Sequence, residues 1–402
     1  MGVSWLMSQI MQADPAAIIT PDGGKTRTAP REFYIDRLRT VMTALVIMHH
    51  TAITYGSPGG WFWYELKPSN SISSLLLLMF CATNQAFFMG FFFLLAGYVT
   101  PPSLERKGYG WFIGDRFTRL GLPLLGFIFI LGPLTAAMAH AADHQGEFWP
   151  VFPYLWNHVI IINGPLWFAQ ALLIFSLVYC AWRRFVGPPV GSMDRIATPV
   201  PGYAAWLLSA FAVGAAAVLI RQFVPVGKNV IGLQLGYFAS YIFLFVLGLA
   251  AWRNDWLRRL NISHVRPWLT ALAIAWPMLL ATFLLANRVN GPGKSHFDTG
   301  FSWTAIAYAF WEPFVAWGLI SGCLLVFRNY FNKPSNTWKW LGRRAYAVYV
   351  IHPPVLVGAS LLARGWHAPA LVKFGVVGAI AVVACWIVSD PLVRLPGLRR
   401  IF

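Results

Sequence analysis

The sequence predicts an all-α, polytopic membrane protein with about ten transmembrane helices. Three observations support this fold class. Only 11% of the 402 residues are charged, whereas soluble domains average about 25%. Hydrophobic residues make up 57% of the chain, and the mean hydropathy is +0.58. Apolar runs of about 18 or more residues recur along the chain, and a transmembrane helix needs about 20.

Ten apolar segments are expected to form these helices. They are 37–56, 73–100, 119–140, 165–183, 203–221, 231–252, 268–287, 302–327, 342–364 and 369–390. Together they are predicted to form one ten-helix domain, residues 37–390. Residues 1–36 and 391–402 are expected to be its terminal tails.

Two segments depart from a plain transmembrane helix. The second span is long and contains Asn84 and Gln85, so it is expected to be tilted or broken. The stretch FPYLWNHVIIIN, at 152–163, is too short to cross a bilayer. It is interpreted as an interfacial or re-entrant segment.

The distribution of positive charge predicts the orientation. Lysine and arginine are enriched in the cytoplasmic loops of membrane proteins. Of the 31 Lys and Arg, seven fall in the odd-numbered connections and the rest in the tails and the even-numbered connections. Both termini are therefore expected in the cytoplasm. The net charge of +17 then follows from this basic collar, which anionic membrane lipid favours, and no nucleic acid partner is expected.

Ionisable side chains lie in the middle of three predicted spans. They are the His49–His50 pair, Glu312 and His352. Charged groups at a helix centre cost about 2.5–3.5 kcal/mol on insertion scales and are functional candidates by default. A structural alternative stays open for each of them. A buried histidine can simply bond a backbone carbonyl, and Glu312, which precedes Pro313, can bond a freed backbone group.

The first span places an arginine and a histidine on one face. Arg39 and His50 are eleven residues apart, about 20° from eclipsed and about 16 Å along the helix. His49 is about 80° away from that face, which favours His50 for chemistry and His49 for support. The arrangement suits a ligand that is anionic at one end and reactive at the other, and coenzyme A has this shape.

Two further arginines add cations near the same predicted surface. Arg116 and Arg119, three residues apart, occupy neighbouring positions on one helix face. Solvated arginines on an interfacial helix are the alternative interpretation. No metal site or disulfide is expected from the lone, apolar-flanked cysteines Cys81, Cys180, Cys323 and Cys385.

These residues resemble the bacterial membrane acyltransferase-3 family. FYIDRLRTVMTALVIMHH is similar to the family's opening block, in which an arginine, ten residues and a histidine correspond to Arg39 and His50. FFFLLAGYVTPPSLERKGYGWFIGDRFTRLGLPLL resembles its second block, with the Arg-x-x-Arg pair at Arg116 and Arg119. GPLWFAQALLIFSLVY and RRAYAVYVIHPPVLV resemble later blocks.

The resemblance implies transfer of an acyl group, often acetyl, from cytoplasmic acyl-CoA to a hydroxyl of a carbohydrate or glycolipid. It implies a location in the bacterial inner membrane. In the expected mechanism Arg39, Arg116 and Arg119 hold the phosphates of acyl-CoA. His50 acts as general base or as acyl-carrying nucleophile. Glu312 or His352 orients it or accepts the proton, and His49 supports it.

Two other functions stay open at the level of sequence. A proton-coupled transporter of a glycan or small metabolite would also need ionisable groups at mid-depth, although no paired broken helices are evident. A non-catalytic scaffold for polysaccharide assembly would tolerate loss of His50. The acceptor, the acyl chain and the oligomeric state are not predicted.

Overall fold

The computed structural model describes residues 32–402 except 145, 159, 189, 191–197, 292–293 and 295. Residues 1–31 of the predicted N-terminal tail therefore lie outside the described residues. Within the described residues the chain forms helices and no β-strand, apart from isolated bridges between Tyr55 and Leu66 and between Val230 and Leu233.

Each predicted span corresponds to helical structure. The long helices are α2 (Phe33–Thr54), α3 (Ile72–Arg116), α7 (Trp167–Phe185), α8 (Tyr203–Phe223), α9 (Phe238–Arg253), α11 (Ile262–Asn290), α12 (Trp303–Tyr330), α13 (Asn336–Leu362) and α14 (Ala370–Arg394). The shorter ones are η1 (Phe117–Gly121), α4 (Leu122–Gly126), η2 (Phe127–Leu131), α5 (Gly132–Asp143), α6 (Val151–Asn157), η3 (Gly164–Leu166), η4 (Leu235–Tyr237), α10 (Trp256–Arg259) and η5 (Leu398–Arg400).

In the described part of the chain, eight helical segments are long and apolar enough to cross a membrane. The difference from the ten predicted spans has two sources. One segment, Ile72–Asp143, covers the predicted spans 73–100 and 119–140 together. Helix α2 is not among the eight, and it is less apolar because it carries Asp36, Arg37 and Arg39 besides two histidines. The all-α polytopic fold class is confirmed.

The region between the second and third predicted spans is not a loop. Helix α3 continues through Pro101 and Pro102 to Arg116 and breaks at Gly108, which has φ 68° and ψ 171°. A positive φ is accessible to glycine at little cost because it lacks a Cβ. This backbone break redirects the helix, and Arg116 lies beyond it.

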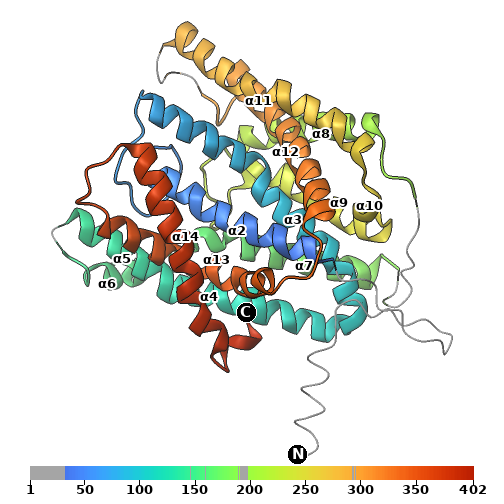
Figure 1. Ribbon diagram of the computed structural model, residues 1–402, viewed down its shortest axis with the longest axis horizontal. Coiled ribbons are helices and arrows are strands. Elements are labelled where there is room, and N and C mark those ends of the chain that lie inside the picture. Colours follow the sequence, from blue (N-terminus) through green and yellow to red (C-terminus); the bar gives the residue numbers. More distant parts are fainter. Residues whose placement is uncertain are drawn as a thin grey trace, which may run out of the picture.

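Helix α2 is enclosed by helices from both ends of the sequence. It packs against α3, α13, α14 and α12, and Figure 1 shows it crossing the middle of the molecule behind α14.

The closest approach of two other core helices, α3 and α9, occurs at Gly97 and Gly248. A Cβ built on Gly97 would lie 2.2 Å from the carbonyl oxygen of Phe245. Small residues at such crossings allow the backbones of membrane helices to approach closely.

Candidate active site

Two of the predicted histidines meet inside the helical bundle. His50 near the end of α2 and His352 in the middle of α13 approach with 3.1 Å between His50 Nδ1 and His352 Nε2. Their rings are nearly parallel, at 16°. His352 is fully buried and His50 is partly exposed. The sequence predicted both residues as candidates, and the structure brings them into direct contact.

The hydrogen bonds of this pair define where the protons lie. A backbone carbonyl can only accept, so the 2.6 Å contact between His352 Nδ1 and the Tyr349 carbonyl places a proton on Nδ1. The Nε2 of neutral His352 is then an acceptor, and the Nδ1–H of His50 donates to it. The basic lone pair of His50 is consequently on its Nε2. The Val46 carbonyl, one turn earlier on α2, is a second hydrogen-bond partner of the His50 ring.

An indole covers the two imidazoles. Trp61, in the segment between α2 and α3, stacks on His50 with 4.0 Å between ring centroids and 15° between planes. It is also parallel to His352, at 5.9 Å and 12°. Trp61 was not among the predicted site residues. The only available signal was its place in an aromatic-rich stretch, residues 59–68.

His49 has a different environment from His50. It is buried against Phe88 of α3, with 5.0 Å between ring centroids. Its backbone carbonyl accepts a hydrogen bond from the Cys81 thiol at 3.6 Å, and its Nδ1 has no partner among the described residues. The two adjacent histidines therefore face different neighbours, as the helical geometry predicted.

The three predicted arginines lie near one another, where the beginnings of α2 and α13 meet the end of α3. Arg116 is close enough to Arg39 and Arg119 for their positive charges to act on it. Arg116 lies over the Phe112 ring at 4.7 Å, and its buried Nε has no described partner. The hydroxyl of Tyr346 on α13 donates to the Arg119 carbonyl at 2.6 Å.

Carboxylates offset only part of this positive charge. Arg39 is 3.8 Å from Asp36, and about a third of its side chain is exposed. Asp115 is shared between Lys107 at 2.8 Å and Arg119 at 3.1 Å. The cluster therefore combines exposed guanidinium groups with a buried, unsatisfied N–H, a donor set suited to phosphate oxygens.

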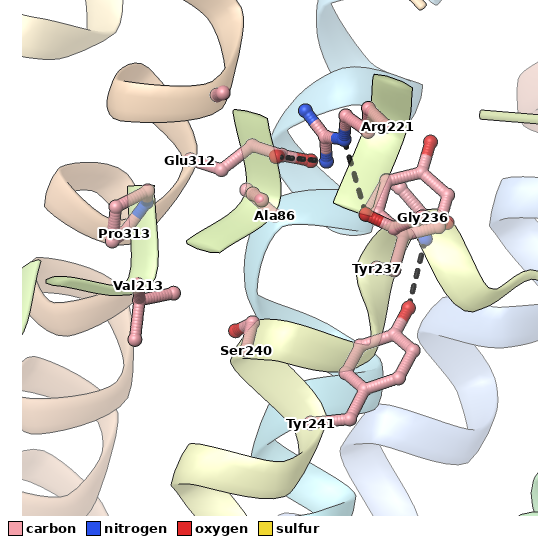
Figure 2. Close-up of a pocket in the computed structure, with 12 residues that line it drawn as sticks. Ala86, Val213, Arg221, Gly236, Tyr237, Ser240, Tyr241, Glu312 and Pro313 are labelled. Atoms are coloured by element: carbon pink, nitrogen blue, oxygen red, sulfur yellow. Dashed lines mark hydrogen bonds and ion pairs between the residues drawn. The ribbon is translucent and has the colours of Figure 1, made fainter. Parts of the chain in front are cut away.

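Glu312 occupies a separate site. Its carboxylate pairs with Arg221 of α8 at 2.5 Å, and Arg221 Nε donates to the Gly236 carbonyl at 3.0 Å (Figure 2). The rings of Tyr237 and Tyr308 flank the guanidinium, each 5.3 Å away. Both charged residues are buried.

The cavity at this ion pair holds about 10 Å³ of free space, enough for one water. Twelve residues line it, and none of the predicted histidines is among them. Glu312 thus contacts Arg221, and neither His50 nor His352 hydrogen-bonds to it. Arg221 was not among the predicted site residues, because the two partners are 91 residues apart in the chain and nothing local indicates their pairing.

The fold and these side chains define a class of protein: a polytopic helical membrane protein with a histidine pair inside the bundle and an arginine cluster near the start of α2. A family model confirms the family. The acyltransferase-3 model, described as an acyltransferase domain, matches residues 32–390, and the chain belongs to this family.

Curated relatives are more distant. Glucans biosynthesis protein C of Escherichia coli (strain K12) is 26% identical over 157 residues, which is 38% of this chain and 39% of that protein. Glucans biosynthesis protein C of Salmonella typhi is 26% identical over 153 residues, 37% of this chain and 38% of that protein. The chain thus aligns with about two fifths of the length of these relatives. No solved structure matches the chain.

Proposed function

We propose that this membrane acyltransferase moves an acyl group, with acetyl as the first to test, from cytoplasmic acyl-CoA to a hydroxyl of a carbohydrate or glycolipid. The observation that carries the proposal is the contact between His50 and His352. It leaves the Nε2 lone pair of His50 available on the same helix as Arg39.

Acyl-CoA binds through its phosphates to Arg39, Arg116 and Arg119. The basic cluster and its unsatisfied Arg116 N–H support this assignment. Arg39 and His50 are separated by about 16 Å along α2, because a helix rises about 1.5 Å per residue. A pantetheine arm is long enough to cover that distance, so the thioester reaches the imidazole while the phosphates stay at the helix start.

His50 Nε2 is the reacting nitrogen. As a general base it takes the proton of the acceptor hydroxyl while the hydroxyl oxygen attacks the thioester carbonyl carbon. The carbon–sulfur bond breaks, and the departing thiolate takes the proton from His50. As a nucleophile, the same nitrogen attacks the thioester carbonyl carbon and releases the thiolate. The acceptor hydroxyl then attacks the acyl-imidazole, its proton passes to the thiolate, and the neutral imidazole leaves. His352 accepts the hydrogen bond from His50 Nδ1 in both schemes and fixes the tautomer.

Four other assignments belong to the same proposal. His49 supports the helix end through its packing on Phe88. Glu312 acts through its ion pair with Arg221 and takes no part in the histidine chemistry. No metal takes part, and the reaction occurs in the bacterial inner membrane. The name of the curated relatives supports a glucan as the first acceptor class to test.

The proposal is tested with membrane vesicles that contain the protein and radiolabelled acetyl-CoA. Label should enter an envelope glycan or glycolipid when the cytoplasmic face is accessible to acetyl-CoA, and mild base should release it, as expected for an ester. Vesicles with the His50→Ala variant are the control. Absence of label from acetyl-CoA and from longer acyl-CoAs in every glycan and lipid fraction would contradict the proposal.

A further inference from the structure

The indole of Trp61 lies flat over both imidazoles of the His50–His352 pair. The three rings are within 16° of parallel, and the shortest centroid distance is the 4.0 Å between Trp61 and His50. Since the two imidazoles are joined edge to edge by the hydrogen bond, one aromatic face covers them together. This stacking is separate from the hydrogen bond that sets the tautomer.

The α2–α3 segment (residues 55–71) holds Trp61 at this position. The amides of Glu65 and Leu66 donate to the Thr54 carbonyl at 3.0 and 3.1 Å, next to the end of α2. The amide of Trp61 itself donates to the hydroxyl of Tyr64 at 2.9 Å. The carboxylate of Glu65 pairs with Lys373 of α14, and both side chains are at least nine-tenths buried.

The described surroundings of His50 differ from those of many reactive histidines, because no carboxylate is paired with its ring. Two titratable rings lie beside the pair: His49 on α2, 5.5 Å from His50, and Tyr349 on α13, 5.9 Å from His352. The Cys81 thiol on α3 contacts the His49 carbonyl. Glu65 and Lys373 neutralise one another. In the part of the chain that the structure describes, no carboxylate pairs with His50 or His352.

We infer that Trp61 is a positioning and charge-stabilising residue for the transfer reaction. Its π face stabilises the cationic form of His50, in the role that a carboxylate plays in other histidine sites. A cation over a tryptophan face within about 6 Å of the centroid is stabilised by the ring quadrupole, and tryptophan is the best of the aromatic residues for this purpose. This inference rests on the proposed function of His50.

The role holds for either chemistry of His50. As a base, His50 gains the acceptor's proton on Nε2 while Nδ1 keeps its own, so the ring becomes positive. As a nucleophile, His50 gains the acyl group on Nε2 with Nδ1 still protonated, and the ring again becomes positive. The positive ring returns to neutral when the proton passes to the thiolate or the acyl group passes to the acceptor.

The test compares Trp61→Leu and Trp61→Phe in the vesicle assay, with kcat measured across a pH series. Leucine keeps the site apolar and removes the π face, so kcat should fall about 2- to 30-fold, the range expected for a cation–π contact. The acidic limb of the kcat profile should move to lower pH, because the imidazolium is then less stable. Phenylalanine should give an intermediate kcat and limb position.

Trp149→Leu is the matched control, because Trp149 is 76% exposed at the turn before α6. This substitution should leave kcat and the acidic limb of its pH profile unchanged. A Trp61→Leu enzyme with wild-type kcat and pH limb overturns the inference. A Trp61→Phe enzyme as slow as the Trp61→Leu enzyme, with the acidic limb of its kcat profile unmoved, also overturns the inference. That result would assign the effect to the indole N–H. If the wild-type protein transfers nothing from any acyl-CoA, the proposed function fails and this inference fails with it.

Discussion

The reactivity of His50 depends on which of its nitrogens carries the proton. The Tyr349 carbonyl fixes the proton of His352, and His352 in turn accepts from His50 Nδ1. A hydroxyl of Tyr349 bonded to the Pro165 carbonyl holds this turn of α13 in place. The series of hydrogen bonds ends at His50, whose Nδ1 carries the proton and whose Nε2 therefore carries the lone pair.

Removing the acceptor for His50 Nδ1–H should slow transfer. We expect His352→Phe to lower kcat about 10- to 100-fold, because a buried N–H left without an acceptor costs about 1–3 kcal/mol. His352→Gln should recover part of the loss, since its amide oxygen can accept. The measurement is kcat for both variants at matched protein level. A fully active His352→Phe enzyme would remove His352 from the site.

The arginine cluster should determine the affinity for the donor. Arg39→Ala should weaken acyl-CoA binding about 10- to 100-fold, the range expected for losing charge-assisted bonds to phosphate. Arg39→Lys should recover only part of it, because an ammonium lacks the bidentate fork. Binding of labelled acyl-CoA to purified protein measures this, with the exposed Arg266→Ala as control. Unchanged affinity in Arg39→Ala would exclude Arg39 from the donor site.

At the scale of single residues, the sequence predicted His50 and His352 as candidates and left open whether His352 or Glu312 orients His50. Depth along a helix can be counted from sequence, whereas the identity of neighbouring helices depends on packing. The same limit explains Glu312, which was predicted near the histidines and instead pairs with Arg221. Trp61 was missed because nothing in its local sequence distinguishes a stacked indole from an interfacial one.

Helix α2 is the element that sets the register of the site. It runs as regular α-helix from Phe33 to Thr54, so Arg39 and His50 share a face as predicted. The hydroxyls of Thr40, Thr43, Thr51 and Thr54 each donate to the carbonyl four residues earlier, which satisfies them inside an apolar bundle. The polar residues of this helix therefore do not interrupt it.

The α2–α3 segment should depend on the buried ion pair between Glu65 and Lys373. Lys373→Met leaves the Glu65 carboxylate buried and unpaired, which should lower the free energy of unfolding by about 3–5 kcal/mol. The double variant Glu65→Gln with Lys373→Met should recover much of this loss. Thermal unfolding in detergent measures the wild type, the single variants Lys373→Met and Glu65→Gln, and the double variant. Additive losses in the double variant would show that the two side chains do not stabilise each other.

The ion pair between α8 and α12 should be structural. Glu312→Gln leaves Arg221 buried without its carboxylate and should destabilise the protein by several kcal/mol. Turnover per folded molecule should change little, because no contact joins Glu312 to the histidines. The measurements are the midpoint of thermal unfolding and kcat on the same preparation. A stable Glu312→Gln protein with lost turnover would place Glu312 in the reaction.

The predicted helices are confirmed as elements, but their connections were less predictable. The hydropathy pattern located the apolar segments because each needs about 20 residues to cross a bilayer. It could not show that α3 continues to Arg116, since residues 101–116 are polar and contain Pro101 and Pro102. The break at Gly108 depends on a backbone conformation that the presence of a glycine permits but does not require.

For the whole molecule, the fold class and the family were both predictable from sequence. Composition and recurrent apolar runs predicted a helical membrane protein, and the resemblance of several sequence blocks indicated the family that the match over residues 32–390 confirms. The cytoplasmic location of both termini stays a prediction. The acceptor also stays open, because the alignment with the curated relatives spans only about two fifths of their length.

The central claim is that His50 carries the transfer chemistry and His49 only supports it. The most direct measurement is transfer of label from acetyl-CoA to the native glycan, in membranes that hold His50→Ala or His49→Ala at matched expression. His50→Ala should lose about 10²–10⁴-fold in rate, as expected for a general base, while acyl-CoA binding survives. His49→Ala should lose stability rather than turnover. An active His50→Ala enzyme beside an inactive, stably folded His49→Ala enzyme would contradict the account.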